Sequence, residues 1–194
     1  MMFTTARLTL RPFSERDADA FRVLAGDWGV ARMTSDIPHP IGPEAARQWL
    51  APAAGEQRFA ICREGRLIGG AGTFRRDAGS GELGFWLGRA WWGQGFATEA
   101  ARAVLTHGLA TAGYVGFSSS HFDDNPASRR VLEKLGFEPG GAGRIWSVAR
   151  GCIVEAQWYW LAQEKAAALH GAPPLETIPQ SRWGRLIERL PRLT

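Results

Sequence analysis

Residues 84–100 read Gly84-Phe85-Trp86-Leu87-Gly88-Arg89-Ala90-Trp91-Trp92-Gly93-Gln94-Gly95-Phe96-Ala97-Thr98-Glu99-Ala100, and no other stretch says more about the architecture. A strand-like run ends in a loop with two close glycines, Gly93 and Gly95, and a long helical pattern follows directly. Glycines let a main chain approach a ligand, and the unpaired N–H groups of a helix start lie at the positive end of its dipole. This order predicts a binding site for phosphate groups.

The patterns on both sides of this loop predict an α/β domain. The expected strands are 7–11, 59–63, 67–73, 82–88, 115–122 and 153–161, and the expected helices are 14–26, 28–33, 44–50, 98–112 and one beginning at 125–126. Three strands in a row, followed by alternating strands and helices, indicate a mixed sheet with helices on its faces.

Composition restricts the class of protein. The chain has 194 residues, 45% hydrophobic and 22% charged, which is typical of one globular domain. No apolar run approaches the roughly 20 residues of a membrane helix, and the N-terminus lacks a signal-peptide core, so we expect a cytoplasmic protein with no membrane partner. Dispersed arginines and a net charge of +4 argue against nucleic-acid binding. The two cysteines and four histidines show no zinc-like spacing, so no metal is expected.

Other glycine-rich loops fit the stretch less well. A dinucleotide-binding loop needs Gly or Ala where Thr98 stands, and a P-loop needs a Gly-Lys-Ser/Thr sequence that is absent. A purely structural turn remains an alternative for a glycine pair taken alone.

A second motif argues against a purely structural turn. Asn125-Pro126-Ala127-Ser128 opens a helix, with Asn125 as its cap and Pro126 at its first position, and that helix ends Glu133-Lys134-Leu135-Gly136-Phe137. With the loop and the Arg7-Leu8-Thr9-Leu10-Arg11 opening, these motifs resemble the acetyl-CoA-dependent N-acetyltransferase (GNAT) superfamily, in particular the branch with ribosomal-protein N-terminal acetyltransferases. The resemblance implies the GNAT fold, an α/β fold whose mixed, mostly antiparallel sheet splays at the cofactor site and is flanked by helices.

The resemblance also implies the ligands and the residues that bind them. The cosubstrate would be acetyl-CoA, with no metal, and the acceptor a primary amine: a peptide N-terminus, or a small molecule such as an amino acid, polyamine or drug. A non-catalytic acyl-CoA-binding module is the rival class, and the protein would be a monomer or homodimer. The implied cofactor-binding residues are Phe85, Trp86, Leu87, Trp92, Gly93, Gln94, Gly95, Phe96, Ala97, Thr98, Asn125 and Ser128. Trp92 departs from the Gln or Arg usual in the family.

Two residues are candidates for the chemistry, which must deprotonate the amine and let the thiolate leave. Glu82 shares a strand face with Gly84 and Trp86, and partial desolvation there would make it a stronger base, although a solvated glutamate is equally consistent. Relatives place a base at this strand position, and His121 is the reserve candidate. Ser128 would donate to the departing sulfur, because Leu132 stands where many relatives carry a tyrosine; a helix-start hydrogen bond is the alternative role.

Two further expectations concern the ends of the domain. Trp28 and Met33 are candidates for the wall of a pocket that accepts an amine with an apolar side. We expect the acetyltransferase domain at residues 1–165, followed at 166–194 by a linker and a short basic amphipathic C-terminal tail, whose apolar face carries Trp183, Leu186, Ile187 and Leu190.

Overall fold

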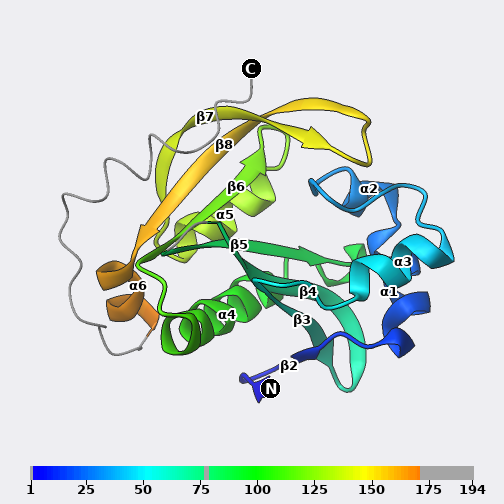
Figure 1. The fold of residues 1–194 in the computed structure, drawn as a ribbon, viewed down its shortest axis with the longest axis horizontal. Coiled ribbons are helices and arrows are strands. Elements are labelled where there is room, and N and C mark those ends of the chain that lie inside the picture. Colours follow the sequence, from blue (N-terminus) through cyan, green and yellow to red (C-terminus); the bar gives the residue numbers. More distant parts are fainter. Residues whose placement is uncertain (1, 77–78, 171–194) are drawn as a thin grey trace.

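The computed structural model describes residues 2–76 and 79–170, in which eight strands form one sheet (Figure 1). The strands are β1 (Phe3–Thr4), β2 (Thr9–Pro12), β3 (Glu56–Arg63), β4 (Arg66–Arg75), β5 (Ser80–Leu87), β6 (Gly116–Phe122), β7 (Glu138–Ser147) and β8 (Cys152–Ala162), in the spatial order β1-β2-β3-β4-β5-β6-β8-β7. Only the β5–β6 pair is parallel among them. The expected mixed, mostly antiparallel α/β fold is confirmed.

Helices cover both faces of the sheet and create two cores. One core contains residues of α4 (Phe96–Ala112), α5 (Pro126–Lys134) and α6 (Gln163–His170). The other contains residues of α1 (Ala18–Ala25), α2 (Trp28–Ala31) and α3 (Pro43–Leu50). Strand β5 serves both cores, because Leu83 and Leu87 belong to the first and Trp86 to the second, as strand alternation predicts.

The sheet opens between β5 and β6. Their parallel pairing covers only Ser80↔Gly116, Gly81↔Phe117 and Glu82↔Ser118. Just beyond it, the buried Ser119 hydroxyl donates a 2.8 Å hydrogen bond to the Leu83 carbonyl. The two strands then separate, which is the splay that the family resemblance implied.

The structure contains two longer elements that the patterns did not predict, β7 and α6. Strand β7 begins Glu138-Pro139-Gly140-Gly141, a composition that disfavours strands, and it lies at the edge of the sheet with a bulge between Pro139 and Gly141. Helix α6 follows β8 directly and is held by its C-terminal residue, because His170 Nε2 lies 3.1 Å from the Leu135 carbonyl and the His170 carbonyl accepts from Thr106 at 3.0 Å. Tertiary contacts therefore explain β7, whose local sequence disfavours a strand, whereas the Ala-rich sequence of α6 itself favours a helix.

The expected tail helix with Trp183, Leu186, Ile187 and Leu190 lies outside the described residues. The division of the chain into a domain at 1–165 and a tail at 166–194 therefore stays a prediction. Within residues 2–76 and 79–170, no helix combines the length and apolarity needed to cross a membrane.

Candidate active site

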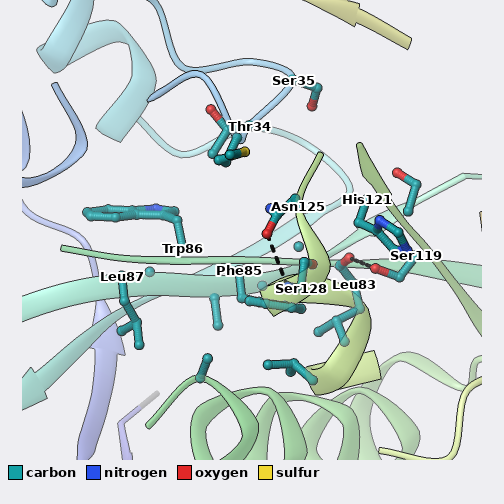
Figure 2. A pocket seen from close by; sticks show the side chains of 18 of the residues that line it. Thr34, Ser35, Leu83, Phe85, Trp86, Leu87, Ser119, His121, Asn125 and Ser128 are labelled. Atoms are coloured by element: carbon teal, nitrogen blue, oxygen red, sulfur yellow. Dashed lines mark hydrogen bonds between the residues drawn. The ribbon is translucent and has the colours of Figure 1, made fainter. Parts of the chain in front are cut away.

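A pocket of about 730 Å³ lies where β5 and β6 separate (Figure 2). The predicted residues that line it are Glu82, Phe85, Trp86, Leu87, Trp92, Gly93, Gly95, Phe96, Ala97, Thr98, Asn125 and Ser128, together with His121. Gln94 does not line it, because its side-chain amide turns away and donates to the Ala90 carbonyl at 3.0 Å. The fold thus brings the two motifs of the sequence to one site.

The loop before α4 has the geometry that a phosphate site needs. Gly93 and Gly95 have φ values of +73° and +81°, in the left-handed region that favours glycine. Gly95 is the N-cap of α4, and the N–H of Glu99 returns to its carbonyl at 3.1 Å. The N–H groups of residues 96–98 precede this first helical bond, so they are open to an anion at the positive end of the helix.

Hydrogen bonds from side chains hold this loop in place. The Arg7 guanidinium donates to the Gln94 carbonyl at 3.0 Å and to Glu99 at 2.6 Å. Burial alone would raise the pKa of Glu99, but hydrogen bonds from Thr5 and Arg7 outweigh it and hold the pKa below its usual value. On the other side, the Trp92 indole donates to the Leu87 carbonyl at 2.7 Å. Trp92, the departure from the family pattern, therefore ties the loop to the end of β5.

The open edge of β5 presents main-chain groups to the pocket. The Leu83 and Leu87 carbonyls accept from Ser119 and Trp92 rather than from β4, so they face the opening. Alternate residues of a strand direct their main-chain groups to the same side, which places the N–H and C=O of Phe85 there as well. An extended ligand with amide groups fits such an edge as an added strand would.

Glu82 lies where the opening begins, in the last parallel pair with Ser118. Its side chain is 16% exposed, lines the pocket and forms an ion pair with Arg76. The hydrogen bond to Glu82 raises the pKa of Arg76 above its ordinary value. The strand pattern placed Glu82 on the correct face but gave no sign of its arginine partner.

Ser128 lies on the opposite side of the opening, in the first turn of α5. Its main-chain N–H donates to Asn125 Oδ1 at 3.1 Å, so Asn125 is the helix cap as predicted (Figure 2). The Ser128 hydroxyl has no hydrogen-bond partner within the described part of the chain. Leu132, one turn on, is fully buried. Ser128 is therefore the hydroxyl that α5 offers to the pocket.

His121 is buried, with 7% of its surface exposed. Its Nδ1 lies 2.8 Å from the Phe122 carbonyl, which favours the tautomer with the proton on Nδ1. The lone pair of Nε2 then remains available, and no described residue bonds to that atom. His121 therefore stays the second candidate for the base, after Glu82.

The far end of the pocket is lined by aromatic side chains, of which Trp86 was expected among the cofactor-binding residues and the others were not singled out by the sequence. We call this part the acceptor end and define it by Phe13, Met33, Asp36, Trp49, Phe74 and Trp86. Met33 was predicted there, but Trp28 lies in a separate hollow of about 420 Å³. Phe13, Trp49 and Phe74 come from three separate segments, so no local pattern joins them. The one hint is that Gly70, Gly72 and Gly84 alternate on this face of neighbouring strands.

An ion-pair bridge is centred on Asp124, which lines the pocket. Asp124 accepts from Arg32 at 2.5 Å and from Arg150 at 2.9 Å, and the Val148 N–H donates to the Ser35 carbonyl at 2.9 Å. The bond to Arg150 holds the pKa of Asp124 below its usual value. The bridge joins the segment after α2 to the β6–α5 turn and the β7–β8 hairpin, which reaches toward α2 in Figure 1.

Comparisons with known proteins agree with this geometry. Residues 7–138 match the family model of the acetyltransferase (GNAT) domain. The N-acetyltransferase p20 of Bacillus licheniformis is 26% identical over 172 residues, 84% of this chain and 97% of that protein.

Two solved structures share the fold. One is an acetyltransferase (GNAT family) from Bacillus anthracis, with a TM-score of 0.73, 22% identity and coverage of 84% of this chain and 99% of that one. The other is RimL, the ribosomal L7/L12 alpha-N-protein acetyltransferase, in complex with coenzyme A, with a TM-score of 0.74, 17% identity and coverage of 85% and 99%.

Proposed function

We propose that this chain, which belongs to the GNAT acetyltransferase family and is an acyltransferase, transfers the acetyl group of acetyl-CoA directly to a primary amine. The observation that carries the proposal is the single pocket that joins the glycine loop, the open edge of β5 and Glu82. These parts fit acetyl-CoA: an anion site for its pyrophosphate, and the Phe85 main chain for its pantetheine amides.

The residues then divide the reaction between them. Glu82 accepts a proton from the acceptor ammonium, directly or through a water molecule, so that the amine nitrogen can attack the thioester carbonyl. A C–N bond forms, the C–S bond breaks, and CoA leaves as a thiolate that takes up the second proton lost by the nitrogen. The Ser128 hydroxyl donates a hydrogen bond to that sulfur. The ion pair with Arg76 keeps one Glu82 oxygen engaged and leaves the other for the amine.

Among acceptors, we place a peptide N-terminus first and a small-molecule amine second. The likeness to RimL, a ribosomal L7/L12 alpha-N-protein acetyltransferase, supports the first. A catalytically silent acyl-CoA-binding module is the rival from another class.

One experiment separates these functions. Acetyl-CoA affinity is measured by calorimetric titration, and release of the CoA thiol is measured with a panel of peptide, amino-acid and polyamine acceptors. We expect binding together with acceptor-dependent thiol release. Binding without turnover on every acceptor favours the silent module, and absence of binding refutes the proposal.

A further inference from the structure

On one face of the sheet, side chains of the acceptor end pack closely over glycines. A Cβ at Gly70 would stand 2.7 Å from Trp86 Nε1, and a Cβ at Gly84 would stand 2.9 Å from Phe74 Cε2. Both distances are too short for any residue larger than glycine. Trp86 and Phe74 therefore pack directly against the main chain and leave room above them.

Aromatic side chains continue from this surface around the pocket. Trp49 makes edge contacts with Phe13 and Trp86, with ring centroids 5.6 and 6.4 Å apart. Phe13, Met33, Trp49 and Phe74 are each only half-buried, although they line the pocket. A ligand that covers apolar surface in a pocket of this kind removes it from water, and this favours binding.

Three arginines line the pocket beside the residues of the acceptor end, and all three already have partners. Arg58 donates to the carbonyls of Trp49 and Ala51 and pairs with Glu56 at 2.8 Å. Arg75 donates to the Ala112 carbonyl and lies over the Tyr114 ring, and Arg76 pairs with Glu82. A ligand carboxylate would thus compete with existing bonds for every one of these cations.

Asp36 has the opposite character. Its partner is the neutral Trp49 indole N–H at 2.8 Å, and no cation in residues 2–76 or 79–170 pairs with it. The acceptor end therefore carries a carboxylate whose charge is not balanced by a neighbour. Such a charge attracts an ammonium group and repels a carboxylate.

From these observations we infer that the acceptor is a primary amine that carries an aromatic or bulky apolar group and has no carboxylate beside the amine. The apolar group covers Phe13, Trp49 and Phe74, while the charge of Asp36 favours the ammonium over a carboxylate. The inference rests on the proposed function and narrows it, because it excludes free amino acids and polyamines. An apolar peptide N-terminus and an arylalkylamine share the required chemistry.

Four probes test this inference: L-phenylalaninamide, phenethylamine, glycinamide and L-phenylalanine. Their kcat/KM is measured with saturating acetyl-CoA, and their affinity for the CoA-bound enzyme is measured by calorimetry. We expect L-phenylalaninamide to exceed both glycinamide and L-phenylalanine by about tenfold or more, the usual scale of discrimination by an apolar pocket. The ratio of L-phenylalaninamide to phenethylamine then tells a peptide-like acceptor from an arylalkylamine.

The inference is overturned if glycinamide or L-phenylalanine equals L-phenylalaninamide, or if neither aromatic amine binds the CoA-bound enzyme. Failure of acetyl-CoA itself to bind is a different result and removes the proposed function. The acceptor panel of the proposed function also contains polyamines. Turnover of a polyamine in preference to the aromatic amines would leave the proposed function intact and remove only this inference.

Two variants connect the preference to the residues. Phe74→Ala should lower kcat/KM for L-phenylalaninamide about tenfold and leave glycinamide within about twofold. Trp146→Ala is the control, because Trp146 is 54% exposed on β7 and does not line the pocket. Asp36→Asn should lower kcat/KM for L-phenylalaninamide and glycinamide by the same factor. Asp19→Asn is its control, because the Asp19 side chain is 97% exposed and does not line the pocket. An equal effect of Phe74→Ala on both amides, at an unchanged melting temperature, contradicts the assignment.

Discussion

Helix α4 has a left-handed glycine at each end, and the pair allows a controlled test of the phosphate site. Gly95, the N-cap, has φ +81° and lines the pocket, whereas Gly113, the C-cap, has φ +63° and does not. We compare Gly95→Ala with Gly113→Ala. Alanine is preferable to aspartate, because the Cβ of residue 95 would lie 3.4 Å from Arg7 Nη2, where a carboxylate could form a new ion pair.

Both variants should lose similar stability. An L-residue held in the left-handed region costs about 1–2 kcal/mol, which for a chain of this length lowers the melting temperature by about 2–8 °C. Only Gly95→Ala should also lower the affinity for acetyl-CoA. To relieve its strain, residue 95 must rotate the peptide plane that carries the Phe96 N–H. Loss of one hydrogen bond to a charged group costs about 1.5–3 kcal/mol, which corresponds to about 10- to 150-fold in affinity.

The assay is calorimetric titration of acetyl-CoA into each folded variant, beside thermal unfolding without ligand. The expected pattern is a shared fall in melting temperature and a loss of affinity confined to Gly95→Ala. If the two variants bind acetyl-CoA equally well, the loop is a structural turn and the phosphate-site assignment is wrong.

Three further predictions concern single side chains. Glu82→Gln should lower turnover about 10²- to 10⁴-fold with acetyl-CoA affinity nearly intact; a variant that stays within about threefold of wild type, well below the usual general-base effect, would transfer the role to His121 or water. Ser128→Ala should lower turnover more than affinity and leave the melting temperature almost unchanged, because its hydroxyl bonds to no described residue; a destabilised but kinetically normal variant would make Ser128 structural. Asp17 is 5% exposed; burial would raise its pKa, but bonds from Arg11 and Ser14 hold the pKa below its ordinary value. Its ionised form therefore adds stability at neutral pH, and this is lost as pH falls through the lowered pKa. Asp17→Asn should flatten the acid limb of stability measured by thermal unfolding from about pH 7 to pH 3, and an unchanged limb would refute this.

The features that could be predicted from the sequence are those with short-range physical causes. The cap at Asn125, the left-handed stop at Gly113 and the alternation along β5 each depend on a few neighbouring residues, and all three are found in the structure. The glycine loop was predictable for the same reason.

The remaining features depend on residues distant in sequence. Strand β7 contains glycine where the Trp158 ring packs, so its sequence disfavours the strand that its neighbour imposes. The ion pair of Glu82 with Arg76, and the gathering of Phe13, Trp49 and Phe74, exist only after the sheet has formed. The part of the pocket formed by the glycine loop and the start of α5 could thus be predicted from the sequence, and most of the acceptor end could not.

The bridge of Arg32, Asp124 and Arg150 has a consequence for how substrates meet the protein. Asp124 directly precedes Asn125, the cap of α5, so one carboxylate couples the acceptor-side wall to the cofactor-side helix. While this bridge is intact, the wall and the helix are held in fixed positions, and fixed positions spare the conformational entropy that ordering them on binding would cost. Because the Arg32 and Asp124 side chains are 33% and 41% exposed, salt screens the bridge, and high ionic strength should loosen this preorganisation before it unfolds the domain.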